Sequence, residues 1–531
     1  MKITFAQKQF LLIAAGALSF APTVLADVHL SNLFSDGAVL QHGMDVPIWG
    51  TADAGETIAV SLNGKQAKTT ADNSGRWILR LPALKAGGPF DLTVSGKNTV
   101  VVHNVAVGEV WIASGQSNME YPLETFSPID PVYGPKAKAE IAVANDPLLR
   151  MFTVTKKISP DGTIDKIPGP DGAWKAATPL DAGKFSAVAY YYASELRRKL
   201  NVPVGIIHTS WGGTPAEAWT SRTALEANAS LKPVFATWDK KLADFPGEQK
   251  KYEEQTLREW QQAVGKAKTE GKPAPAKPRA PDGPSSPRRP ATIFNAMVNP
   301  LIPYGIKGVI WYQGESNSGN SSTYKTLFSA MIKDWRSRWS QGEFPFFFVQ
   351  LANFQAVQKQ PVESGWAGFA FIREAQLMTL GLTNTGMASA IDLADPENPE
   401  DVHPHNKREV GRRLSLIALA KVYNEKVASY SGPIYSGFKI AGNKARLSFD
   451  HADGGLMAKN GDVKGFAIAG KDGKFVWADA KIEGNEVVVS SQQVAEPTAI
   501  RYDWAMNPIG NLYNKEGLPA SPFRTDTETS H

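Results

Sequence analysis

The chain of 531 residues contains no cysteine. A protein without cysteine forms no disulfide bond and has no thiol to use as a nucleophile or a metal ligand. Its stability therefore has to come from a buried core, for which the 42% of hydrophobic residues supply the material. At this length we expect one large domain with one or two smaller ones.

Long apolar runs are missing as well. The run at 10–20 is shorter than the roughly 20 residues that a transmembrane helix needs, and no later segment approaches that length. The run follows two lysines and precedes a Val-Leu-Ala sequence, the pattern of a secretory signal peptide cleaved after Ala26. We therefore expect residues 1–26 to be removed and the mature protein to be periplasmic or secreted, without a membrane attachment.

A strong excess of one charge is also missing. The formal net charge is +5, and the two lysines of the expected signal reduce it to +3 in the mature chain (5 minus 2). Nucleic-acid binding usually needs a concentrated basic stripe, whereas the basic residues near 278–289 lie in a proline-rich stretch typical of a solvated loop. No nucleic-acid partner is expected.

The order of the predicted strands and helices divides the chain into a β region, a region in which strands alternate with helices, and a second β region. Residues 28–104 show short β-prone runs separated by turn signals such as Asn63-Gly64, which predicts a small N-terminal β domain. Residues 425–531 again show turn signals between short runs, which predicts a C-terminal β region.

Between them, residues 105–424 alternate strands with helices, which predicts a parallel sheet covered by helices. An insertion at about 231–290 interrupts this pattern, first as a charged, solvent-facing helix and then as an extended proline-rich piece. The strands are expected at 110–113, 202–207, 309–312, 345–351 and 387–391, and the helices at 187–200, 324–339 and 372–380.

The most informative segment is an apolar strand that runs directly into Gly115-Gln116-Ser117-Asn118. Ligands of parallel sheets bind beyond the carboxyl ends of the strands, so Ser117 would stand where a substrate binds. Serine is a weak nucleophile and needs an adjacent base. Alternatively, Ser and Asn here only cap a helix.

The base is sought among eight histidines, and His403 is the candidate. It lies after the last predicted strand and before an amphipathic helix, which is again the carboxyl edge of the sheet. A carboxylate has to fix its tautomer, and four acidic residues compete for that role. We choose Asp401, with Glu400 as the alternative, and with the further candidates Asp392 and Asp395 upstream.

Two more segments follow strands and could supply an oxyanion hole. Gly212 and Gly213 would let backbone amides approach a ligand, and the Gln313 side chain can donate to a developing oxyanion. The neighbouring aromatic residues could stack against a sugar ring or simply pack in the core. The aromatic candidates for substrate binding are Trp211, Trp311 and Tyr312.

Four motifs in this order resemble the sialate O-acetylesterase family, a carbohydrate-esterase branch of the SGNH hydrolases. The resemblance covers nearly the entire mature chain and implies an α/β fold, a three-layer, flavodoxin-like SGNH sheet with β-sandwich or jelly-roll regions before and after it. The motifs are Gly-Gln-Ser-Asn-Met at 115–119, Gly-Gly-Thr-Pro at 212–215, Trp-Tyr-Gln-Gly-Glu-Ser-Asn at 311–317 and Asp-Val-His-Pro at 401–404.

By that resemblance Ser117 is the nucleophile, His403 its base, and the oxyanion hole combines the Ser117 amide, a glycine of the pair and Gln313. Two features depart from the superfamily: Gln313 stands where its third block has an asparagine, and the acid three residues before the histidine is Glu400. The implied activity is removal of acetyl groups from sugars, either sialic acid or plant polysaccharides such as xylan and xyloglucan. The partner is then an acetylated oligosaccharide or polysaccharide, and no cofactor is needed.

Two other functions compete. A non-catalytic carbohydrate-binding protein would explain the β regions and the aromatic residues, but not the ordered motifs. A metal-dependent hydrolase could use Asp401, His403 and His405 as ligands, although two histidines two residues apart on a loop are a weak metal pattern. The interpretation as a serine esterase predicts no metal site.

Overall fold

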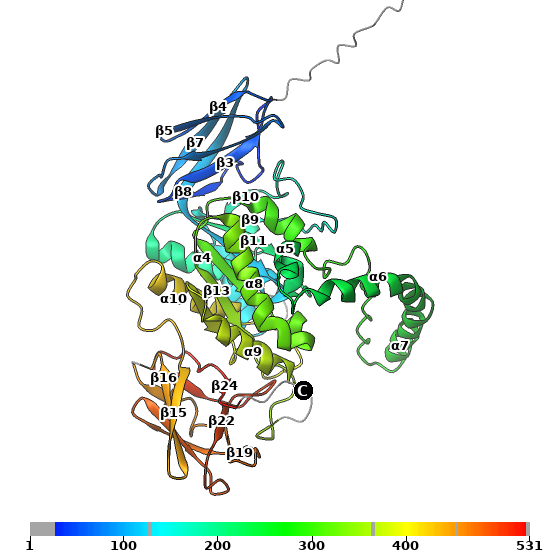
Figure 1. Cartoon of the computed structure of the whole chain (residues 1–531), viewed down its shortest axis with the longest axis vertical. Coiled ribbons are helices and arrows are strands. Elements are labelled where there is room, and N and C mark those ends of the chain that lie inside the picture. The colour runs from blue at the N-terminus through cyan, green and yellow to red at the C-terminus, as the bar shows by residue number, and fades with distance from the viewer. Residues whose placement is uncertain (1–26, 126–129, 363–366, 453, 527–531) are drawn as a thin grey trace, which may run out of the picture.

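The computed structural model describes residues 27–125, 130–362, 367–452 and 454–526, so the expected signal peptide lies outside the described residues. The chain is a mixed α/β protein with one large sheet in its middle and β regions at either end (Figure 1). The predicted α/β class is confirmed. In the part of the chain that the structure describes, no helix is both long and apolar enough to cross a bilayer.

The middle of the large sheet is parallel. Its strand order is β9-β11-β8-β12-β13-β14, and β10 pairs antiparallel with β9 at the edge. All five predicted strands are present, whereas β9 and β10 were not predicted. The bounds are β8 (Thr99–Gly115), β9 (Asp146–Thr153), β10 (Trp174–Ala177), β11 (Val204–Ser210), β12 (Gly308–Tyr312), β13 (Phe346–Gln350) and β14 (Thr385–Ser389).

The N-terminal β region is joined to this sheet by one long strand. The first half of β8 pairs antiparallel with β7, and its second half pairs parallel with β11 and β12. The boundary predicted at 104/105 therefore falls inside a continuous strand. The N-terminal strands are β1 (His29–Leu30), β2 (Val39–Gln41), β3 (Val46–Thr51), β4 (Thr57–Leu62), β5 (Lys65–Thr70), β6 (Arg76–Leu81) and β7 (Gly87–Ser95).

Aromatic side chains pack on both faces of the central strands. Trp111 of β8 meets Tyr192 of α4 (Ala187–Leu200) edge-on, with ring centroids 5.3 Å apart. Trp311 of β12 meets Trp335 of α8 (Ser321–Trp339), with ring centroids 6.0 Å apart. Trp111 pairs in register with Gly308, three residues from Trp311, and side chains alternate along a strand, so the two tryptophans leave the sheet on opposite faces.

Helix α4 has a capping residue at each end. The Ser186 side chain accepts a hydrogen bond from the Ala189 amide at the start of α4, and Asn201 takes the left-handed conformation after its last turn. The longer helices of the sheet region are α2 (Tyr133–Val143), α4 (Ala187–Leu200), α8 (Ser321–Trp339), α9 (Gly368–Thr379) and α10 (Lys407–Lys421). The short ones are α1 (Ser117–Glu120), α3 (Pro179–Ala182), η1 (Ala216–Trp219), α5 (Arg222–Glu226), η3 (Phe294–Val298), η4 (Asn299–Leu301) and η5 (Glu315–Asn320).

The insertion projects from the sheet region as a helical arm (Figure 1). It consists of α6 (Pro233–Lys251), a π-helical turn η2 (Tyr252–Thr256) and α7 (Leu257–Thr269). Residues 272–290 return without helix or strand, and the Tyr252 hydroxyl donates a 2.9 Å hydrogen bond to the Pro278 carbonyl of this return segment. The predicted sequence of helix and extended piece matches this arrangement.

The C-terminal β region lies at the end of the molecule opposite the N-terminal one (Figure 1). It has its own hydrophobic core, around Phe466, Tyr502 and Phe523. The buried Arg373 of α9 donates to the carbonyls of Ala505 and Met506 and so fastens it to the central region. Its strands are β15 (Ile434–Ala441), β16 (Lys444–Asp450), β17 (Leu456–Ala458), β18 (Phe466–Ala469), β19 (Val476–Trp477), β20 (Asp479–Glu483), β21 (Glu486–Ser490), β22 (Ala499–Tyr502), β23 (Leu512–Asn514) and β24 (Phe523–Arg524).

Candidate active site

The carboxyl ends of three neighbouring strands are level with one another. Gly115 at the end of β8 pairs with Ser210 of β11 on one side and with Tyr312 of β12 on the other. The loops that follow these strands therefore start side by side. This register brings the serine, Gly-Gly and glutamine segments to one rim of the sheet, as the sequence predicted.

Ser117 is presented by a sharp turn between β8 and α1. Gly115 has φ of 141°, and a Cβ at this position would lie 2.1 Å from the Tyr312 carbonyl oxygen, so only glycine fits. The Gln116 amide then donates to that same carbonyl at 3.0 Å. The turn leaves Ser117 half-buried as the first residue of α1.

The Ser117 hydroxyl is within hydrogen-bond reach of His403. Its Oγ lies 3.0 Å from His403 Nε2, and His403 Nδ1 lies 2.9 Å from Asp401 Oδ1. The same carboxylate oxygen accepts the His403 backbone N–H at 3.0 Å. With Nδ1 donating to Asp401, Nε2 is left as the acceptor for the serine proton, the arrangement that general-base activation of a serine requires.

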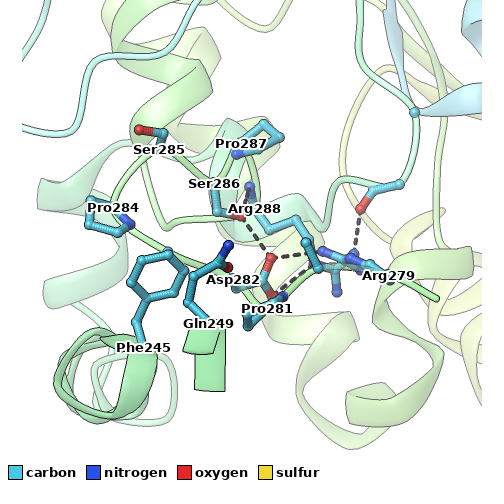
Figure 2. Close-up of a pocket in the computed structure, with 14 residues that line it drawn as sticks. Phe245, Gln249, Arg279, Pro281, Asp282, Pro284, Ser285, Ser286, Pro287 and Arg288 are labelled. Carbon is cyan, nitrogen blue, oxygen red and sulfur yellow. Dashed lines mark hydrogen bonds and ion pairs between the residues drawn. The ribbon is translucent and has the colours of Figure 1, made fainter. Parts of the chain in front are cut away.

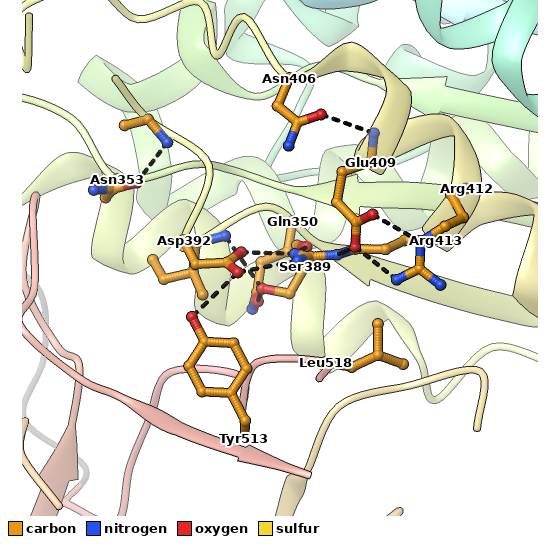
Figure 3. A network of polar contacts seen from close by, with 12 residues as sticks. Gln350, Asn353, Ser389, Asp392, Asn406, Glu409, Arg412, Arg413, Tyr513 and Leu518 are labelled. Carbon is orange, nitrogen blue, oxygen red and sulfur yellow. Dashed lines mark hydrogen bonds and ion pairs between the residues drawn. The ribbon is translucent and has the colours of Figure 1, made fainter. Parts of the chain in front are cut away.

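The other candidate acids are placed differently. The Glu400 side chain is exposed to solvent. Asp392 is held by Arg413, with contacts of 2.7 and 3.0 Å, and accepts the Tyr513 hydroxyl at 3.2 Å, so it belongs to the polar network that ties α10 to β23 (Figure 3). Asp395 accepts the Glu397 amide at 3.0 Å. Asp401 is therefore the acid that the structure brings to His403.

The hydrogen-bond chain continues from Asp401 to His405. Asp401 Oδ2 lies 3.3 Å from His405 Nε2, and His405 Nδ1 lies 2.6 Å from Asp130 Oδ2. These contacts order the loop that carries His403. Within the described ranges, no three His, Asp or Glu side chains converge in an arrangement suited to holding a metal ion.

The Gly212–Gly213 turn lies directly against the serine. A Cβ on Gly212 would come within 3.3 Å of Ser117 Cβ, whereas Gly213, with φ of 72°, has open space at that position. The Gly212 N–H donates to the Glu120 carboxylate, which also pairs with Lys156. Gly212 therefore lies next to the serine, with its N–H bound to the Glu120 carboxylate.

The predicted role of Gln313 in the oxyanion hole is wrong for this geometry. Its side chain is fully buried, and its Nε2 donates to Asn317 Oδ1 at 2.7 Å and to the Thr214 carbonyl at 3.3 Å. Its Oε1 accepts the Tyr324 hydroxyl at 2.9 Å. Both ends of the amide are occupied, so Gln313 joins the second and third motifs behind the site.

The predicted substrate contacts of Trp311 and Tyr312 are also wrong, because neither side chain has any exposed surface. Trp311 packs among Trp219, Phe328 and Trp335 in the core. Trp211 is different: it lies in the loop after β11, partly exposed, with Lys156 Nζ 5.6 Å from its ring centroid. Only this aromatic residue of the three remains available to a sugar.

We expect Trp311→Ala to destabilise the protein by about 3–5 kcal/mol, as large-to-small changes of buried aromatics do. The midpoint of urea unfolding should fall for this reason. The conservative Trp311→Phe should recover most of that loss and leave KM close to that of the unchanged protein. A raised KM with an unchanged unfolding midpoint would instead indicate substrate contact.

A buried polar cluster that the sequence did not predict lies under the serine. Asn118 donates to Glu315 Oε1 at 2.5 Å and to the Val402 carbonyl at 3.1 Å, and it accepts a hydrogen bond from Lys407 Nζ. The Lys407 side chain is 2% exposed. The cluster therefore links the serine turn, the third motif and the histidine loop.

The charges of this cluster act on the base. Burial lowers the pKa of Lys407 to about 7, against the attraction of Glu315 and Asp401. Burial, and after it the Lys407 charge, also lowers the pKa of the His403 imidazole, which Asp401 opposes. Burial would raise the pKa of Asp401, but the hydrogen bond from the His403 amide and the two histidine rings hold it below its ordinary value.

A shift of the pH profile tests this electrostatic link. His403 acts as a base only when neutral, and its pKa is lowered, so the acidic limb of kcat/KM should lie below pH about 6.5. Lys407→Met removes a cation that opposes protonation of His403, so the limb should move to higher pH. Lys421→Met at the far end of α10 is the matched control and should leave the limb in place. An unmoved limb in Lys407→Met would contradict the link.

The comparisons with known proteins agree with this geometry. The sequence model of the family described as carbohydrate esterase, sialic acid-specific acetylesterase, matches residues 290–420. Sialate O-acetylesterase from Mus musculus is 30% identical over 518 residues, which covers 90% of each chain. The enzyme of that name from Rattus norvegicus is 29% identical over 530 residues, again covering 90% of both. The chain belongs to the sialate O-acetylesterase family.

A solved structure supports the same membership. A carbohydrate acetylesterase from Xanthomonas citri is 39% identical in sequence, with a TM-score of 0.76, and the match covers 94% of this chain and 100% of that one. The predicted resemblance to the sialate O-acetylesterase family is thus confirmed. As a member of this family the protein is an ester hydrolase, which decides against a protein that only binds carbohydrate.

Proposed function

We propose that the protein is an exported O-acetylesterase that removes acetyl groups from sugars through a serine acyl-enzyme. The observation that carries the proposal is the 3.0 Å contact of Ser117 Oγ with His403 Nε2, with Asp401 2.9 Å behind the ring. Family membership supports the acetylated carbohydrate as substrate. Export rests on the signal-like pattern of residues 1–26.

In the proposed reaction, Ser117 Oγ attacks the acetyl carbonyl carbon while its proton passes to His403 Nε2. The oxyanion of the tetrahedral intermediate is stabilised by the Ser117 amide and by the Gly212–Gly213 turn, where it displaces the Glu120 carboxylate. A donor of this kind contributes about 3–4 kcal/mol to the transition state in other enzymes. His403 returns the proton to the sugar oxygen, the ester C–O bond breaks, and the sugar leaves.

The acetyl-enzyme is then hydrolysed by the same steps in reverse, with water in place of the sugar hydroxyl. His403 accepts a proton from water, the hydroxide oxygen attacks the acetyl carbonyl, and the Ser117–acetyl bond breaks as His403 protonates Oγ. Acetate leaves and the resting enzyme is restored. Asp401 keeps Nδ1 protonated and stabilises the imidazolium in both halves.

We also assign the catalytic residues to a three-layer SGNH-type region at about 105–424. The contacts of Trp111 with α4 and of Trp311 with α8, on opposite sides of the sheet, support this layering. Trp211 is the proposed sugar-facing aromatic residue, since it is partly exposed next to the Gly212–Gly213 turn.

A panel of acetylated glycans tests the function and identifies the sugar. It should include O-acetylated sialic acid, acetylated xylan and acetylated xyloglucan, with 4-nitrophenyl acetate as a minimal ester. We expect acetate release from the minimal ester and from at least one glycan. No acetate release from any substrate by the folded protein would refute the proposal.

A further inference from the structure

A pocket of about 790 Å³ adjoins the candidate active site. One of its walls is the Gly212–Gly213 turn, which also lies against Ser117. The remaining lining comes from the insertion, with Phe245 and Gln249 of α6 facing the return segment 279–288 (Figure 2). The mechanism above uses no side chain of the insertion.

The pocket is held in shape by several contacts. Arg288 Nη1 donates to the Gly213 carbonyl, so the return segment is fastened to the catalytic turn itself. The Phe245 ring packs against Gly283, where a Cβ would lie only 2.4 Å from the ring. Outside the pocket, the Trp260 indole of α7 donates to the Pro275 carbonyl of the return segment at 3.0 Å. Ligand sites are usually pre-formed in this way, with volumes of about 300–1,000 Å³.

The lining combines an aromatic face with groups that bind hydroxyls. Phe245 is partly exposed, and Gln249 beside it offers an amide donor and acceptor. Arg279 is 59% exposed and pairs with Asp282 at 2.8 Å, which leaves guanidinium donors directed to solvent. A sugar ring has an apolar face and hydroxyls around its edge, so it fits this combination of an aromatic ring and polar groups.

We propose that this pocket binds a glycosyl unit linked to the acetylated sugar, so that the enzyme favours acetylated oligosaccharides over acetylated monosaccharides. The inference rests on the proposed function, because the acetylated unit has to occupy the site at Ser117. The unit next to it along the glycan then lies over the Gly212–Gly213 turn. Phe245 covers its ring face, and Gln249 and Arg279 bind its hydroxyls.

The test compares three substrates. They are the best glycan of the panel above as an oligosaccharide, the matching acetylated monosaccharide, and 4-nitrophenyl acetate. The unchanged protein should hydrolyse the oligosaccharide with the higher kcat/KM of the two sugars. Phe245→Ala and Arg279→Ala should each lower kcat/KM for the oligosaccharide about tenfold, the loss typical of a contact that dominates binding. Both variants should leave the monosaccharide and 4-nitrophenyl acetate unaffected.

Arg258→Ala is the matched control, because Arg258 is an exposed arginine of the same insertion and does not line the pocket. It should behave as the unchanged protein on all three substrates. Equal kcat/KM for oligosaccharide and monosaccharide in the unchanged protein would overturn the inference. So would a parallel loss on all three substrates, which would mean that the insertion only supports the catalytic turn. Failure of the function itself is distinct, since it would appear as no hydrolysis of any substrate.

Discussion

Replacing Ser117 by alanine should lower kcat for acetate release by a factor of about 10⁴ or more, as loss of the nucleophile does in serine hydrolases. The hydroxyl that forms the acyl-enzyme is removed, whereas the backbone donors of the turn remain. Substrate binding should persist, because no group that faces the sugar is lost. Acetate release and equilibrium binding of the glycan, measured on the same preparation, separate the two effects.

Ser316→Ala serves as the control for this variant. Ser316 is also a half-buried serine, and it lies in the third motif two residues after Gly314. It takes no part in the proposed reaction. It should retain most of the activity. Unchanged hydrolysis by Ser117→Ala would refute the assignment of the nucleophile.

Asp401→Asn should lower kcat by about 10⁴, the effect of the same change in a Ser-His-Asp triad. The amide keeps the size of the carboxylate but removes the charge that supports the imidazolium, and it can hold His403 in the wrong tautomer. Glu400→Gln is the matched control at the neighbouring position, and its exposed side chain predicts nearly unchanged kcat. A large loss in Glu400→Gln with little change in Asp401→Asn would move the acid to Glu400, the place that the superfamily spacing favours.

The central strands could be predicted because they are buried on both faces. Such a strand has a continuous apolar sequence, as Gly308–Tyr312 does, and α4 between two of these strands has ordinary capping residues. β9 was missed because Arg150 interrupts its apolar pattern. That arginine is buried, and it donates to the Gly37 carbonyl and to Asn104 Oδ1. Gly37 lies more than a hundred residues away in the sequence, so a local sequence pattern does not reveal this contact.

The boundary expected at 104/105 illustrates a second limit. The N-terminal β domain was predicted to end at Asn104, and this residue adopts a positive φ of 59°. The strand nevertheless continues through this residue, because both of its halves find partners in the same sheet. The irregular backbone at Asn104 therefore lies within β8 and does not end the strand.

In the site, the sequence predicted the position of residues that follow the ends of strands. It did not predict which side chains are buried by tertiary packing. Ser117, the two glycines and His403 converge because the carboxyl ends of parallel strands share one rim. Trp311 and Tyr312 also end a strand, but helices cover both faces of it, so their side chains enter the core. Lys407 looks like a solvent-exposed lysine at a helix start, and only the fold reveals that it is buried beside Asn118.

The central claim is that Ser117 carries the acetyl group during turnover. Rapid mixing with 4-nitrophenyl acetate, followed by an acid quench and peptide mass spectrometry, measures this directly. The account predicts one acetyl group on Ser117 within the first turnover, and none on the Ser117→Ala variant. Steady ester hydrolysis with the acetyl group on another residue, or on no residue at any quench time, would contradict it.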